Sequence, residues 1–156
     1  MRNKQKGFSL IELLIVVAII LIIAAIAIPN LLRSRMAANE ASAVGSLRTL
    51  NTACVSYSST YGIGFPAALG NLAPAAAATA AAADLIDQVL AGGAKSGYTF
   101  TYTPGAAVVG VIPTYTIRAD PNTQDVTGVR HFFTDQSGVI RFKVGAAAAV
   151  GDTPIS

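Results

Sequence analysis

The feature that most constrains this chain is an apolar run from residue 8 to residue 28. The run has 21 residues, and its only strongly polar members are Ser9 and Glu12. A helix rises about 1.5 Å per residue, so this run is long enough to cross a hydrocarbon core of about 30 Å. Three cations precede it: Arg2, Lys4 and Lys6. Because positive charge favours the cytoplasmic side, the pattern predicts a cytoplasmic N-terminus and an exported remainder.

The rest of the charge pattern is balanced. Hydrophobic residues make up 53% of the chain and charged residues 12%, about half the charged share of a soluble globular protein. Of the 11 Lys and Arg, three precede residue 8, which leaves eight against eight Asp and Glu. The net charge of +3 is therefore no argument for a nucleic-acid partner. Arg33 and Arg35 follow the apolar run closely and weaken the topology prediction.

Single copies of two reactive residue types exclude several kinds of site. Cys54 is the only cysteine and His131 the only histidine. This excludes an intramolecular disulfide, a Cys/His zinc cluster and a His-based triad that needs two such positions. No paired carboxylates, nucleophile–base spacing or phosphate loop stand out, so we predict no enzyme activity and no cofactor. We interpret His131, beside two phenylalanines, as a strand residue rather than a ligand.

Beyond Pro29 the hydrophobicity becomes periodic at steps of three and four. One apolar stripe results, formed by Met36, Val44, Leu47, Leu50, Cys54, Tyr57 and Tyr61. The polar faces take Arg33, Arg35, Glu40, Arg48 and many Ser, Thr and Asn residues. We therefore predict one helix from about Phe8 to Tyr61, with Pro29 as a kink or local break. Cys54 on the stripe is expected to be a buried, inert thiol.

The C-terminal half changes to a period of two, which is typical of strands. Tyr98, Phe100 and Tyr102 alternate with threonines, and three further strands are predicted at 115–119, 130–134 and 139–144. Residues 62–96 connect the helix to the strands. Within them, the Ala-rich residues 73–83 and the following residues 84–93 are interpreted as a short helix or, alternatively, as a flexible loop. The tail, 146–156, is expected to be loosely held. The fold class is α+β, with the long helix packed on a small antiparallel sheet within 97–145.

The segment from Lys6 to Leu14 is the most informative part of the chain, because it places Glu12 inside a membrane-length apolar run. One interpretation is local: Ser9 and Glu12 fit a capping box, in which the carboxylate accepts from free amides of the first turn. A second interpretation also accounts for Gly7 and the three basic residues before it. Cleavage after Gly7 would create an ammonium at Phe8, and Glu12 could pair with it within the chain or between neighbouring chains.

This segment resembles the N-terminal signature of type IV pilins and pseudopilins, through Gly7-Phe8-Ser9-Leu10-Ile11-Glu12 and the apolar run ending at Pro29. The resemblance implies that residues 1–7 are a leader, that a prepilin peptidase cuts between Gly7 and Phe8, and that the new Phe8 amine is methylated. It implies that Glu12 guides subunit addition, that residues 8–28 form the membrane-spanning and assembly half, and that residues 29–61 form the amphipathic half. It also implies that the helix near Pro29 unravels on assembly.

Two departures from the family pattern bear on function. Many type IV pilins close a C-terminal loop with a disulfide, which this chain cannot form within itself. Major pseudopilins commonly bind calcium, and Asp120, Asn122 and Asp125 are weak candidates for its oxygen ligands here. Because Asp-Pro-Asn is also an ordinary turn and no EF-hand spacing follows, we predict no metal site.

Three functions remain open on the sequence. The first is a pilin subunit of a homo-oligomeric type IV pilus, held in a bacterial inner membrane before assembly and at the cell surface afterwards. Its expected partners are the prepilin peptidase, the inner-membrane assembly machinery and membrane lipid. The second is a major pseudopilin of a type II secretion system, in a periplasmic filament. The third is a soluble secreted binding domain, released by signal peptidase after Ala25-Ile26-Ala27.

Overall fold

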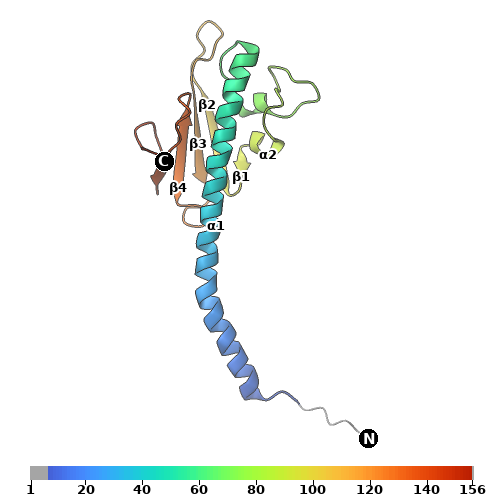
Figure 1. Ribbon diagram of the computed structural model, residues 1–156, viewed down its shortest axis with the longest axis vertical. Coiled ribbons are helices and arrows are strands. Elements are labelled where there is room, and N and C mark those ends of the chain that lie inside the picture. Colours follow the sequence, from blue (N-terminus) through green and yellow to red (C-terminus); the bar gives the residue numbers. More distant parts are fainter. Residues whose placement is uncertain (1–6, 156) are drawn as a thin grey trace. The chain divides into compact units, whose positions relative to one another are not determined.

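The computed structural model describes residues 7–155, so the predicted leader lies outside the described residues except for Gly7. The chain divides into two compact units, Met1–Arg35 and Met36–Ser156, and each is described by itself. The helix α1 runs from Leu10 to Tyr61 and belongs to both (Figure 1). The predicted single helix is therefore confirmed, beginning two residues later than expected.

In the second unit, α1 buries one face. Leu47, Leu50, Cys54 and Tyr57 of the predicted stripe are buried, whereas Met36, Val44 and Tyr61 are partly buried. Ala43 and Ala53 are also buried. Two glycines follow the last helical residue, Tyr61. Gly62 and Gly64 both adopt positive φ angles that favour glycine, and so the chain leaves the helix here. At Gly64 a Cβ would also collide with the Ile112 carbonyl oxygen.

The sheet has six strands in the order β1-β2-β3-β4-β5-β6, each antiparallel to its neighbour. The four predicted strands are β2 (Tyr98–Pro104), β3 (Tyr115–Pro121), β4 (Arg130–Asp135) and β5 (Arg141–Val144). Alternation places Tyr115, Ile117 and Ala119 inward on β3. Residues 36–61 of α1 lie across this sheet (Figure 1), and the two share one core. The α+β fold class is confirmed.

The predicted hairpin between β4 and β5 is also present. Gly138 donates its N–H to the Asp135 carbonyl over 2.9 Å, and the Asp135 carboxylate accepts the Ser137 N–H over 2.9 Å. Gly138 has a φ of 74°, which explains why glycine occupies this position.

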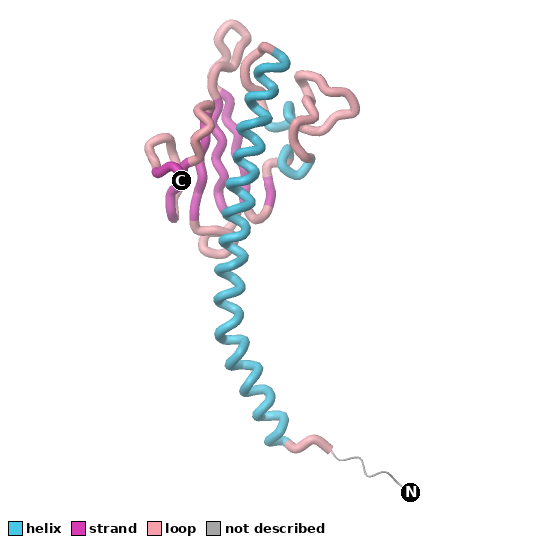
Figure 2. The backbone as a smooth tube through the Cα atoms, in the orientation of Figure 1, coloured by secondary structure: helices cyan, strands magenta, loops and turns pink. Residues whose placement is uncertain are grey.

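The connection between helix and sheet is mostly irregular (Figure 2). The Ala-rich segment from residue 73 to residue 83 is loop, with one isolated bridge between Thr79 and Ala82, so the helical alternative is wrong there. Helical structure is confined to α2 (Gln88–Ala91), capped by the Asp87 carboxylate, and to a short 3₁₀ turn, η1 (Leu69–Leu72). The backbone N–H groups of Ala83, Leu85 and Ile86 donate to carbonyl groups of η1. These hydrogen bonds fix the end of the Ala-rich loop although it forms no helix.

Two very short strands form the sheet edges, and sequence analysis missed both. They are β1 (Ala94–Lys95) and β6 (Thr153–Pro154). Because β6 pairs with β5, the tail is more ordered than expected: Ala148 is buried, and the Ile155 N–H donates to the Ile140 carbonyl over 2.9 Å.

Candidate assembly surface

The start of α1 carries the predicted processing and assembly residues. Gly7, Phe8 and Ser9 precede the helix, and the Phe8 side chain is 80% exposed. The Glu12 carboxylate accepts the Ser9 N–H over 3.3 Å, which is the reach-back half of a capping box. Within residues 7–155, Glu12 forms no ion pair, and the Phe8 nitrogen is still part of the peptide bond to Gly7. Within a single chain, Glu12 therefore acts as a helix cap.

The first unit presents an apolar surface on all sides of the helix. Large side chains that would be buried in a globular protein are exposed, including Leu10 at 79%, Leu21 at 63% and Ile26 at 64%. Within the described residues, α1 is the one helix long and apolar enough to cross a membrane, by length and composition. A continuous apolar surface of this kind requires a lipid or protein environment.

Helix α1 continues through Pro29, so the local break considered from the sequence is absent. Proline has no N–H to donate and crowds the preceding turn, which weakens the backbone bonds around it. The Asn30 side-chain amide donates to the Ile26 carbonyl over 3.1 Å and so adds a donor at this turn. Sequence analysis missed Asn30; an Asn directly after a helical proline is the signal that would have identified it.

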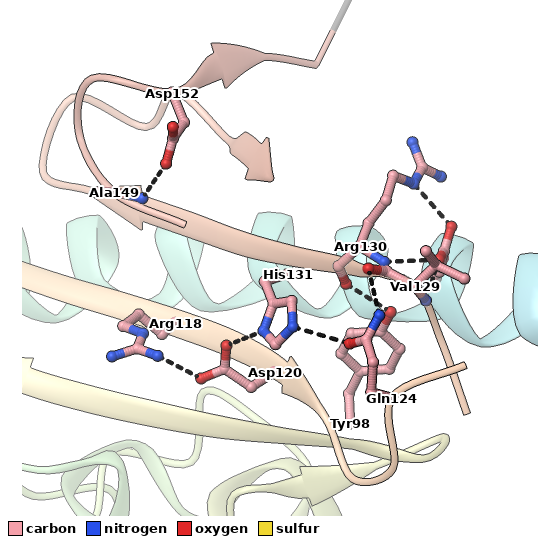
Figure 3. Close-up of polar contacts among 10 residues, drawn as sticks. Tyr98, Arg118, Asp120, Gln124, Val129, Arg130, His131, Ala149 and Asp152 are labelled. Atoms are coloured by element: carbon pink, nitrogen blue, oxygen red, sulfur yellow. Dashed lines mark hydrogen bonds and ion pairs between the residues drawn. The ribbon is translucent and has the colours of Figure 1, made fainter. Parts of the chain in front are cut away.

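Glu40 was expected on a polar face of the helix, and that prediction is wrong. The residue is only 7% exposed. Its carboxylate accepts the Val129 N–H over 2.8 Å, the Arg130 N–H over 3.0 Å and the Arg130 Nε–H over 2.7 Å (Figure 3). Burial raises the Glu40 pKa, but these hydrogen bonds and the Arg130 charge outweigh burial and leave the pKa below its ordinary value.

Asn51 forms a second polar contact between α1 and the sheet. Its amide donates to the Thr134 hydroxyl over 2.9 Å, and its carbonyl oxygen accepts the Tyr115 hydroxyl over 3.1 Å. All three residues are buried. Glu40 and Asn51 both lie three or four residues from members of the apolar stripe, and this spacing would have identified them as buried.

Cys54 is fully buried, as predicted. Burial raises the pKa of its thiol to about 12, so almost no reactive thiolate forms at neutral pH.

The three calcium candidates already have partners within the chain. Asp120 contacts His131 Nδ1 over 2.6 Å and Arg118 over 3.0 Å (Figure 3). The Asn122 side-chain oxygen accepts the Thr99 hydroxyl over 2.7 Å, and Asp125 accepts from Gln124 over 3.4 Å. Residues 7–155 contain no group of three His, Cys, Asp or Glu side chains that could hold a metal ion.

His131 lies on β4, as predicted, and its second ring nitrogen contacts the Gln124 side-chain oxygen over 3.0 Å. The Gln124 contact connects the loop between β3 and β4 to the sheet, whereas the Asp120 contact joins β3 to β4. They give the loop a structural role.

Comparison with known proteins identifies the N-terminal segment. Residues 2–28 match the family model described as the prokaryotic N-terminal methylation motif. The chain is 68% identical over 40 residues to the type IV wide pilus major component PilA4 of Thermus thermophilus, covering 26% of this chain and 30% of that protein.

Two further relatives are major pilus proteins by name. The type IV major pilin protein PilA of Myxococcus xanthus is 48% identical over 54 residues, which is 35% of this chain and 24% of that protein. The type IV major fimbrial protein FimA of Dichelobacter nodosus is 50% identical over 58 residues, which is 35% of this chain and 37% of that protein.

The similarity is confined to part of each protein. The chain spans between 24% and 37% of the length of these relatives, and no solved structure matches it. The exposed apolar helix, the Glu12 cap and the methylation motif lie in the same segment. In this N-terminal segment, the chain is similar to type IV pilins.

Proposed function

We propose that this chain is a pilin, the structural subunit of a type IV pilus. The observation that carries the proposal is an exposed apolar helix that begins two residues after the Gly7-Phe8 pair. This apolar surface carries one carboxylate, Glu12. Lipid covers this surface before assembly, and the same segments of neighbouring subunits cover it in the filament. The names of the relatives favour a pilin over a pseudopilin.

The proposal includes a processing step. A prepilin peptidase hydrolyses the amide bond between Gly7 and Phe8. The new Phe8 amine then attacks the methyl group of a sulfonium donor, which leaves as a thioether, and the amine releases a proton. Gly7 and Phe8 lie outside the helix, so their peptide bond is accessible to a protease without unwinding of α1. The released leader carries Arg2, Lys4 and Lys6, and the mature chain has balanced charge.

In assembly, the Phe8 ammonium of one subunit pairs with Glu12 of its neighbour. Glu12 is the only acidic residue of the described part of the first unit, so this one charge fixes the axial register of helices that otherwise present apolar side chains. An unpaired carboxylate among packed apolar helices is expensive, which disfavours any other register.

Intact mass and N-terminal sequencing of the cellular protein test this function. We expect a mature chain that begins with a methylated Phe8. A mature terminus at Ile28 would contradict the proposal and support the secreted domain. Gly7→Val is expected to leave an uncut, membrane-held precursor, because the added side chain blocks close approach of the peptidase to the backbone.

A further inference from the structure

Two arginines follow the apolar segment, and they have no protein partner within the described residues. Arg33 and Arg35 are exposed, and neither forms an ion pair or side-chain hydrogen bond within residues 7–155. The next acidic residue along α1 is Glu40, whose carboxylate is already bound by Val129 and Arg130. The charges of Arg33 and Arg35 are therefore available to an external anion.

The position of the two arginines along the helix shows how far from the hydrocarbon core of a membrane such an anion would lie. At about 1.5 Å per residue, Arg33 and Arg35 lie about 7 and 10 Å beyond Ile28 along the helix axis. The polar interface of a bilayer extends about 5–8 Å beyond each side of the hydrocarbon core. Flexible arginine side chains reach back toward this layer. If residues 8–28 span the membrane, both guanidinium groups reach the lipid phosphates.

Their position around the helix favours lipid over a single protein partner. Positions two residues apart point about 200° apart, so Arg33 and Arg35 lie on nearly opposite sides of α1. A single flat protein surface contacts one of them, whereas headgroups surround the whole helix. The planar guanidinium also matches phosphate oxygens in a bidentate geometry.

We propose that Arg33 and Arg35 form an arginine collar that binds the headgroup phosphates of anionic phospholipids around the unassembled subunit. The collar holds the end of the apolar segment at the membrane surface. This inference rests on the proposed function, because it requires that the subunit is held in a membrane before assembly. Each arginine is expected to enrich anionic lipid beside the helix by about fivefold over a zwitterionic lipid.

Ser34 lies between the two arginines and offers a site for a probe. In the full-length chain, Ser34→Cys is labelled with a fluorophore, because the one native thiol, Cys54, is buried. The labelled protein is placed in vesicles that contain equal amounts of phosphatidylglycerol and phosphatidylcholine, with bromine quenchers on one lipid or the other. We expect stronger quenching by brominated phosphatidylglycerol, and loss of that preference in about 1 M salt, where the Debye length is about 3 Å.

The test variant is Arg33→Gln with Arg35→Gln, and the matched control is Arg48→Gln, another exposed arginine of α1 without an ion pair in residues 7–155. The preference should disappear in the double variant and persist in the control. Equal quenching by the two lipids in the wild-type protein would overturn the collar while leaving membrane insertion intact.

Flotation of the same vesicles separates this inference from the proposed function. If the wild-type protein does not float with vesicles of either lipid, the membrane-held subunit is wrong, and the collar with it. If the double variant retains the lipid preference but forms fewer filaments, the arginines contact acidic groups of a neighbouring copy, and the collar is wrong.

Discussion

At the scale of single residues, Glu12 has one observed role and one proposed role, and the two are separable. In one chain it caps the helix through the Ser9 N–H, and glutamine can replace it in that role. In the proposed filament its charge would meet the Phe8 ammonium of a neighbour, and an amide would not replace that charge. A pair about 4 Å apart is worth about 4 kcal/mol before desolvation at an effective dielectric near 20.

We therefore expect Glu12→Gln to be cut after Gly7 and to accumulate as a folded membrane subunit with few or no filaments. Electron microscopy of sheared filaments, with immunoblots of membrane fractions, measures both. Wild-type filament numbers in this variant would leave Glu12 as a helix cap alone.

Cys54 tests the docking of the helix on the sheet. Because the thiol is buried and its pKa is raised to about 12, a bulky thiol reagent should label it only after denaturation. Cys54→Ala should lower stability by about 1 kcal/mol or slightly more, through lost packing, without affecting filament number. Rapid labelling of the native protein would show that the helix face is not covered.

At the scale of elements, Glu40 joins α1 to β4 and should make stability sensitive to acid. Its pKa is lowered in the folded state, so its contribution is fully present above the ordinary carboxyl pKa of 4.5 and is lost as pH falls through the folded value. Glu40→Gln should lower the free energy of unfolding by about 1.5–3 kcal/mol at neutral pH.

Thermal melts at several pH values measure this contribution. The gap between wild type and Glu40→Gln should narrow as the pH falls below 4.5. In Asp87→Asn, which removes a surface pair with Lys95 that also lowers the pKa of Asp87, the gap should be smaller at every pH, because an exposed pair contributes little. A gap that stays constant down to acid pH would contradict the proposed role of the Glu40 charge.

The elements also show what a single sequence predicts. The long helix and the strands β2 to β5 have clear periods of hydrophobicity, and their positions were predicted closely. The edge strands β1 and β6 have two residues each, too few to show a period. The spacing of Glu40 from the apolar stripe indicates a buried position, but its hydrogen-bond partners lie 89 and 90 positions away, and a local pattern does not reveal them. In the assembly segment, the Asn30 side chain bonds to the Ile26 carbonyl four residues earlier, and a hydrophobicity pattern does not show such a bond.

At the scale of the whole molecule, buried tyrosines connect separate segments through their hydroxyl groups. Tyr57 donates to the Ala80 carbonyl, Tyr98 to the Arg130 carbonyl and Tyr102 to the Pro66 carbonyl, over 2.7, 2.8 and 2.7 Å. Burial raises the pKa of each hydroxyl above the ordinary value of 10.0. The folded protein therefore holds these protons more tightly than the unfolded chain does.

This shift predicts a loss of stability in alkali. The contribution of the tyrosines is complete below pH 10.0 and is lost as pH rises above it toward the folded pKa values. Melting temperatures should fall above this pH. Tyr102→Phe should lower stability by about 1 kcal/mol at neutral pH and make the alkaline fall shallower. An identical alkaline fall in Tyr102→Phe would contradict this assignment.

The two short edge strands have a consequence for a protein that is concentrated in one place. Unpaired strand edges invite uncontrolled addition of strands from other molecules, which leads to aggregation. Here each edge has only two residues; one contains Lys95, and the other contains Pro154, which has no N–H to donate. The sheet edges are therefore protected against strand addition between copies, and in the proposed filament the contacts that drive growth would come from the helices.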